Sequence, residues 1–294
     1  MRIRLASLSI LMVLYAAAVH AAPATYYLAL GDSLAVGLQP SLPVDVPTDH
    51  GYVDDLYAVA HRLDPNLQLK KLGCSGETTA TMIAGGSSCY PEGSQLAAAV
   101  AFLHTHRVSL VTLDIGANDV DQCFDITTDP PTIMEGCVAT NLAAIESNLV
   151  TILIALQGAA RPNTRIVAMN YYDPFLAAWK LLPSPTGPAL ACESLVLTTG
   201  FVSAPCSPAV SPVSLNTVLE NVYQAYHVPV ADVATAFHIQ DFANVPVVNL
   251  PLNVFLTLTL TWMDAPPPLG PDIHPNAAGY ATIAAAFAEK IVAP

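Results

Sequence analysis

The chain has 294 residues, a formal net charge of −13 and an apolar content of 53%. Such an acidic balance excludes nucleic acid and anionic lipid headgroups as electrostatic partners, because both repel a negative surface. The length and the apolar content suffice for one large α/β domain with a sizeable core.

The first residues are typical of a secretory signal peptide. Two arginines precede a short apolar run, and Val19-His20-Ala21 then offers small residues where a signal peptidase cleaves. A membrane anchor is the alternative, but the run is short and a cleavage site follows it. We therefore expect residues 1–21 to be removed, residues 22–294 to form the mature domain, and the protein to be secreted or periplasmic.

Six cysteines in an exported chain predict disulfides. Six cysteines allow 15 pairings, and the spacing favours three local pairs, each closing a loop worth about 3 kcal/mol on the chain-entropy model. These pairs are Cys74–Cys89, Cys123–Cys137 and Cys192–Cys206. The cysteines and histidines lack the spacing of a zinc site, so we expect no structural metal.

Short apolar runs alternate with segments of helical periodicity along most of the chain. The predicted strands lie near residues 27–30, 67–72, 108–115, 165–170 and 228–230, and the predicted helices cover 52–63, 95–106, 138–157, 215–226 and 277–291. This alternation predicts a parallel sheet with helices on both faces.

Two segments interrupt the alternation. Residues 174–212 are rich in proline and contain the last cysteine pair, so we expect an irregular inserted loop region that shapes or covers a cleft. Residues 245–262 are strongly apolar, but prolines and asparagines interrupt them. An apolar loop beside the cleft is therefore a better interpretation than a membrane span. The sequence predicts a single domain.

Polar turns follow three of the predicted strands, and they carry Ser33, Gly73 and Asn118. A parallel sheet brings such turns to one edge, which His274 can also reach from the loop before the last helix. A serine nucleophile needs a base, and acyl transfer needs hydrogen-bond donors for an oxyanion. Taken singly, each residue also fits a structural role, since Asp32 and Ser33 can cap a helix and the other two are common in turns.

Four short motifs carry a family resemblance. They are Gly-Asp-Ser-Leu at 31–34, Gly73 within Leu-Gly-Cys-Ser-Gly-Glu-Thr, Gly-Ala-Asn-Asp at 116–119 and Asp-Ile-His-Pro at 272–275. In this order they resemble the four blocks of the SGNH (GDSL-type) esterase/lipase superfamily. The resemblance implies a flavodoxin-like three-layer sandwich with a parallel sheet of about five strands. It also implies ester hydrolysis without a metal or cofactor.

The resemblance also assigns roles to individual residues. Ser33 would be the nucleophile and His274 the base. The oxyanion hole would consist of the backbone N–H groups of Ser33 and Gly73 and the side-chain amide of Asn118. The glycine that follows the serine in the Gly-x-Ser-x-Gly motif of α/β-hydrolases is absent, because Ala35 stands at that position.

The acid of the triad departs from the family pattern. The family places it three residues before the histidine, where this chain has Pro271, while Asp272 lies only two residues before. Either the Asp272 carboxylate orients the imidazole, or the Pro271 carbonyl does so and Asp272 caps the last helix.

The expected activity is hydrolysis of lipid or short-chain acyl esters through an acyl-enzyme. Removal of acetyl groups from a glycan is an alternative, and a secreted binding protein without activity is another. Apolar residues that could line an acyl groove are at 181–182, 195–197, 201–202 and 254–260. We expect a monomer that acts on a small-molecule or lipid ester without stable membrane insertion.

A calcium loop is a further possibility to weigh, because Asp119, Asp121 and Asp125 lie close together in sequence. They lack the twelve-residue spacing and the closing glutamate of such a loop. We therefore interpret them as a solvated acidic loop.

Overall fold

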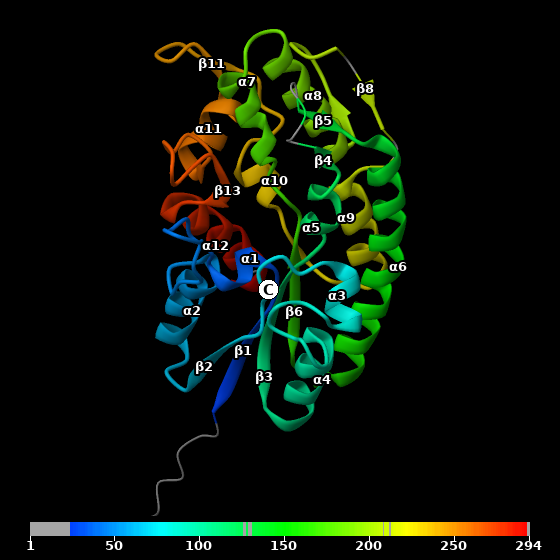
Figure 1. Cartoon of the computed structure of the whole chain (residues 1–294). Coiled ribbons are helices and arrows are strands. Elements are labelled where there is room, and N and C mark those ends of the chain that lie inside the picture. The colour runs from blue at the N-terminus through cyan, green and yellow to red at the C-terminus, as the bar shows by residue number, and fades with distance from the viewer. Residues whose placement is uncertain (1–23, 126–127, 129–130, 208, 212, 293–294) are drawn as a thin grey trace, which may run out of the picture.

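A parallel five-stranded sheet lies at the centre of the computed structural model, with strand order β2-β1-β3-β6-β9 (Figure 1). The structure describes residues 24–125, 128, 131–207, 209–211 and 213–292, so the expected signal peptide lies outside the described residues. The strands are β1 (Thr25–Gly31), β2 (Leu67–Lys71), β3 (Val108–Asp114), β6 (Arg165–Met169) and β9 (Val230–Ala231). The predicted α/β three-layer fold is confirmed.

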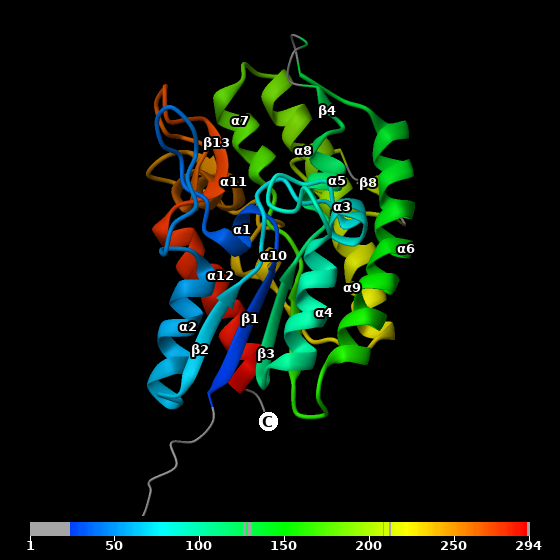
Figure 2. The ribbon, with the colours of Figure 1, turned by 60° about the horizontal axis from the view of Figure 1, so that its bottom comes forward.

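Helices cover both faces of the sheet (Figures 1 and 2). On one face α2 (Tyr52–Leu63) packs against α12 (Ala277–Val292), and on the other α4 (Gln95–Thr105) and α9 (Leu215–Ala225) flank α6 (Glu135–Ala159). Because both faces are covered, the apolar side chains of the central strands are almost entirely buried. These five helices match the predicted ones to within a few residues.

One described helix, α6, is long and apolar enough to cross a membrane by length and composition. In the folded domain one side of α6 is buried, including Ile145, Leu149 and Ile152, and α6 packs against α3 (Thr79–Ala84), α4 and α9. A core helix of a folded domain has the same composition, so the packing accounts for the apolar character of α6.

The chain between β6 and α9 is more regular than the sequence predicts. It contains the 3₁₀ turn η1 (Pro174–Ala177), α7 (Ala178–Leu181), α8 (Thr186–Thr199) and a hairpin of β7 (Phe201–Val202) with β8 (Ala209–Val210). The prediction of an irregular loop is wrong here, because a proline in the first turn of α8 is compatible with a helix.

The apolar segment 245–262 also differs from its prediction. Instead of a loop it forms α11 (Leu252–Leu260), which packs against η1 and α12. In Figure 1, α7, α8 and α11 lie beyond the carboxyl edge of the sheet. The remaining short elements are α1 (Ser33–Val36), α5 (Ala117–Asp121), α10 (Val233–Ala236), β4 (Phe124–Asp125), β5 (Thr132–Ile133), β10 (Asn244–Val245), β11 (Leu250–Pro251), β12 (Thr261–Trp262) and β13 (Asp272–Pro275).

The six cysteines form three disulfides between sequence neighbours, as the spacing predicts. The pairs are Cys74–Cys89, Cys123–Cys137 and Cys192–Cys206. Three disulfides suggest an extracellular or periplasmic protein, because such bonds persist in oxidising compartments.

The end of β1 requires a glycine. Gly31 has a φ of +142°, and a Cβ there would lie 2.2 Å from the carbonyl oxygen of Asp114 on β3. The side chain of Gln95 accepts a hydrogen bond from the Gly31 N–H at 2.7 Å and donates one to the Gly31 carbonyl at 2.9 Å. These contacts fix the backbone immediately before Ser33.

A buried carboxyl group holds the segment that follows β6. The side chain of Asp173, only 1% exposed, accepts hydrogen bonds from the Phe175 N–H at 2.9 Å and from the Ser194 hydroxyl at 2.7 Å. It thereby joins η1 to α8. Burial raises the pKa of Asp173 to about 7, and the hydrogen bonds from Ser194 and Phe175 act in the opposite direction.

We predict that Gly31→Ala destabilises the protein by at least about 2 kcal/mol, because the new methyl group collides with β3 in a backbone conformation that favours glycine. Chemical denaturation monitored by circular dichroism measures the change. Gly136→Ala is the matched control, since nothing lies within 4 Å of a Cβ at this helical position. A loss no larger than that of the control would contradict the close approach.

Asp173 also predicts a pH dependence of stability. Its folded pKa lies above the unfolded value near 3.9, so its contribution to stability is complete below about pH 4 and is lost as the pH rises to about 7. Between these pH values the unfolding free energy of Asp173→Asn should therefore fall less than that of the wild type, by about 2–4 kcal/mol. Denaturant titrations across this range measure it, with Glu146→Gln on the exposed side of α6 as the control for loss of one charge. Equal slopes for wild type and Asp173→Asn would rule out the effect.

Candidate active site

Ser33 begins α1 directly after β1, and the turn is held by buried acids. The Asp32 side chain accepts from the Leu34 N–H at 2.9 Å and from the Tyr171 hydroxyl at 3.1 Å. The backbone N–H of Asp32 donates to the Asp114 carboxyl at 3.1 Å. Asp32 thus caps α1 as its structural interpretation predicts, and it leaves the neighbouring Ser33 hydroxyl free of this role.

The two carboxyl groups beneath the turn lie close together. Burial raises the pKa of both Asp32 and Asp114, and their mutual repulsion raises the pKa of Asp114 further. The Tyr52 hydroxyl donates to the other oxygen of Asp114 and favours its ionised form. The sequence does not predict a role for Asp114, Tyr52 or Tyr171, because only the fold brings them next to the serine turn.

The turn after β2 packs directly on the serine turn. A Cβ at Gly73 would lie 2.6 Å from the Cβ of Ala35 in α1, so only glycine allows this approach. The N–H of Gly73 makes no hydrogen bond with another described residue. It is therefore an unused donor next to α1.

Asn118 lies in α5, after β3. One N–H of its side-chain amide donates to the carbonyl oxygen of Glu77 at 3.0 Å, which fixes the orientation of the amide. The side chain lines a cavity together with Ser33 and His274. Ser33, Asn118 and His274, which lie far apart in the sequence, therefore line the same cavity.

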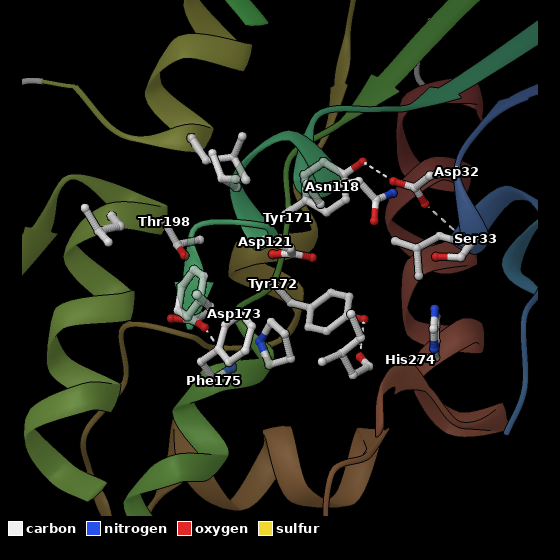
Figure 3. Close-up of a pocket in the computed structure, with 18 of the residues that line it drawn as sticks. Asp32, Ser33, Asn118, Asp121, Tyr171, Tyr172, Asp173, Phe175, Thr198 and His274 are labelled. Atoms are coloured by element: carbon white, nitrogen blue, oxygen red, sulfur yellow. Dashed lines mark hydrogen bonds between the residues drawn. The ribbon is translucent and has the colours of Figure 1, made fainter. Parts of the chain in front are cut away.

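His274 lies on β13, which pairs with β12 in an antiparallel arrangement, whereas the sequence predicts a loop. Its Nδ1 lies 2.8 Å from Oδ1 of Asp272, and the same oxygen accepts from the His274 backbone N–H at 2.8 Å. Burial opposes the ionisation of Asp272, but the hydrogen bond and charge of His274 outweigh it and lower the pKa of Asp272. With Nδ1 bonded to Asp272, Nε2 faces Ser33 (Figure 3).

The choice between Asp272 and Pro271 has a clear geometric outcome. The carboxylate of Asp272 lies 2.8 Å from Nδ1 of the imidazole. The cap of α12 is Asn276 instead, whose side chain accepts from the N–H groups of Ala278 at 3.0 Å and Gly279 at 3.2 Å. Asp272 is therefore available to orient the histidine.

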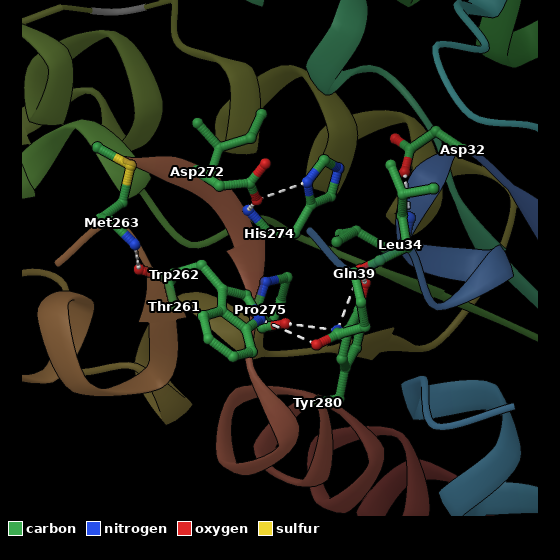
Figure 4. Close-up of polar contacts among 12 residues, drawn as sticks. Asp32, Leu34, Gln39, Thr261, Trp262, Met263, Asp272, His274, Pro275 and Tyr280 are labelled. Carbon is green, nitrogen blue, oxygen red and sulfur yellow. Dashed lines mark hydrogen bonds and ion pairs between the residues drawn. The ribbon is translucent and has the colours of Figure 1, made fainter. Parts of the chain in front are cut away.

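Gln39 fixes β12 and β13 to the loop that follows α1 (Figure 4). Its side chain accepts from the Trp262 indole N–H at 2.9 Å and donates to the Pro275 carbonyl at 2.9 Å. The hydroxyl of Tyr280 donates to the carbonyl of Leu38 at 2.9 Å. These contacts hold the histidine strand close to the serine helix.

Beyond the polar groups, the wall of the cavity is largely apolar (Figure 3). Its apolar side chains include Val120, Phe124, Val138, Phe175, Leu197 and Leu215. The rings of Phe124 and Phe175 stack with centroids 4.0 Å apart. Of the residues expected to line an acyl groove only Leu197 does so, while Val254 and Leu258 belong to a separate buried cluster.

The three aspartates weighed as a calcium loop do not converge. Asp119 is buried and accepts hydrogen bonds from the backbone N–H and the hydroxyl of Thr79 at 2.9 and 2.6 Å. Asp121, in contrast, lines the cavity. The interpretation as a solvated acidic loop is therefore wrong for both residues.

Comparisons with solved structures support the fold. The chain is similar in structure to an extracellular lipase from Streptomyces rimosus, with 18% identity over 90% of this chain and 99% of that chain and a TM-score of 0.54. It is also similar to a phospholipase A1 from Streptomyces albidoflavus, with 19% identity over 92% and 100% and a TM-score of 0.53. A lipase from a goat rumen metagenome has 16% identity over 90% and 96% and a TM-score of 0.51.

At these identities the likeness concerns the fold. None of the curated proteins compared with the chain is a match. The family model for the GDSL-like lipase/acylhydrolase family, however, matches residues 29–282. The chain belongs to the GDSL-like lipase/acylhydrolase family, an assignment that supports an ester hydrolase of the esterase/lipase type.

Proposed function

We propose that this protein is a secreted hydrolase of carboxylic esters that acts through an acyl-enzyme on Ser33. The observation that carries the proposal is the meeting of the Ser33 hydroxyl, the His274 imidazole and the Asn118 amide at one end of an apolar cavity. The disulfides and the signal-like N-terminus support secretion. One chain supplies all these residues, which supports a monomer as the active form.

In the proposed mechanism, Nε2 of His274 takes the proton of the Ser33 hydroxyl while Oγ attacks the ester carbonyl carbon. Asp272 holds the imidazole with Nδ1 protonated and stabilises the positive charge that it acquires. The imidazolium then gives its proton to the departing alcohol. A water molecule, deprotonated by the same histidine, attacks the acyl-enzyme and releases the acid.

The oxyanion of each tetrahedral intermediate needs donors beside Ser33. We assign this role to the backbone N–H groups of Ser33 and Gly73 and to the side-chain amide of Asn118. The bond from Asn118 to the Glu77 carbonyl leaves its second amide hydrogen free. A donor that is already oriented stabilises the developing charge without reorganisation, and loss of one typically lowers turnover ~100- to 1000-fold.

The apolar part of the cavity wall fits the hydrocarbon part of an acyl group. Phe124, Phe175, Val138 and Leu197 can surround a short or medium hydrocarbon chain, and each buried methylene contributes ~0.8 kcal/mol. Because about half of the described lining residues are apolar and none of the similar structures described above is a glycan esterase, a glycan O-acetyl esterase is the less supported alternative.

We predict that Ser33→Ala and His274→Ala each lower kcat/KM for a chromogenic butyrate ester by about ten-thousandfold or more, because nucleophile and base act as a unit. Asp272→Ala should cost less, about a thousandfold, since the base itself remains. Steady-state rates on folded protein measure all three.

Ser109→Ala and His104→Ala are the matched controls, because both residues are exposed and lie away from the cavity. Both should keep wild-type rates. Retention of activity in Ser33→Ala would remove the serine from the mechanism. A wild type that releases acetate from an acetylated glycan but does not cleave the butyrate ester would instead favour the alternative.

A further inference from the structure

Three carboxyl groups line the cavity, and only one of them lacks a hydrogen-bond donor. Asp32 is bonded to Leu34 and Tyr171, and Asp173 is bonded to Phe175 and Ser194. No described residue donates a hydrogen bond to the side chain of Asp121, and no ion pair of the described part of the chain includes it. Asp121 thus has no structural role comparable to that of the other two acids.

The position of Asp121 places it within reach of a bound ester. It ends α5 three residues after Asn118, so both side chains lie on the same side of the helix. Figure 3 shows its carboxylate pointing into the cavity that Ser33 and His274 also line. A substrate attached to Ser33 and held by Asn118 would extend past Asp121.

The charged side chains that line the cavity are mainly acidic. Neither lysine nor arginine is among its described lining residues. Two of the lysines form ion pairs elsewhere, Lys71 with Asp54 and Lys180 with Asp264. A negative group in the cavity would therefore meet carboxylates of like charge in a poorly solvated space, where repulsion is stronger than in water.

An unpaired carboxylate in an apolar wall is costly to desolvate unless a partner hydrogen-bonds to it. A substrate that brings a hydroxyl or an ammonium group to this point supplies the partner. A purely apolar substrate supplies none, and an anionic one adds repulsion.

We propose that Asp121 determines substrate specificity, favouring esters whose bound acyl part is cationic or donates a hydrogen bond and rejecting esters that carry a negative charge there. The inference rests on the proposed ester hydrolysis and narrows its substrate class. It places anionic acyl groups outside the range of this enzyme.

Desolvation by burial, together with the nearby Asp32 and Asp173, raises the pKa of Asp121 to about 7. Assays at about pH 8 therefore measure the ionised form of the carboxylate.

The test compares three methyl esters of equal chain length: methyl hexanoate, and matched esters that end in a carboxylate or in an ammonium group. The wild type should hydrolyse the ammonium ester with the highest kcat/KM and the carboxylate ester with the lowest. In Asp121→Asn the ratio of kcat/KM for ammonium over carboxylate ester should fall about tenfold or more, since one charge is lost. A ratio between substrates cancels any effect of the substitution on Ser33 or His274.

Glu146→Gln removes one charge from the exposed side of α6 and should leave the ratio unchanged. Asp121→Leu, which matches the apolar wall, should lose the same discrimination and gain on methyl hexanoate. If Asp121→Asn unfolds, Asp121→Leu answers the question alone. An unchanged ratio in a folded variant, or a wild type that cleaves the carboxylate ester as fast as methyl hexanoate, would overturn the proposal. Failure of all three esters would overturn the proposed function as well.

Discussion

The close contact between the ends of β1 and β3 is the constraint on which the site depends. Gly31 has no side chain, so the backbone of β1 can lie against Asp114, and the Asp114 carboxyl then accepts from the N–H of Asp32. Gln95 bonds to both polar groups of Gly31 from a third element. The residue that follows these contacts is Ser33, so hydrogen bonds and close packing fix the backbone immediately before its hydroxyl. Pre-organisation of this kind is what a nucleophile needs, because reorganisation during reaction would add to the barrier.

The histidine reaches the serine by a different route. β13 pairs with the short strand β12, and the side chain of Gln39 joins both strands to the loop after α1. Gln39 lies in the chain segment that begins at Ser33. Its hydrogen bonds therefore connect the strand that carries the base to the segment that carries the nucleophile.

Much of the fold was predictable because the sheet has both faces covered and its strands read as continuous apolar runs, while α2 and α9 have a polar side and an apolar side. The helices beyond the carboxyl edge of the sheet were not predictable, because α8 and α11 are apolar on more than one side and their prolines lie at helix ends. Within the site, Ser33, Gly73 and Asn118 follow strand ends and could be recognised by that pattern, whereas His274 was expected on a loop and lies on β13. Gln95, Asp114 and Tyr171 could not, since their partners lie tens of residues away and no local pattern marks such a pair. The sequence indicated only that Asp121 belongs to an acidic segment. Its position in the cavity follows from the structure.

The acidity of the cavity has a consequence for turnover in the proposed reaction. The histidine becomes positively charged when it takes the serine proton, and the carboxyl groups of Asp272, Asp32 and Asp121 all stabilise that charge. The ester group that enters is uncharged, whereas the carboxylic acid group that leaves loses its proton at neutral pH. The carboxylates that assist the charged histidine then repel the product from a space of low polarity. One arrangement of charge therefore favours both the first step and the last, and an enzyme built in this way should bind its acid product weakly.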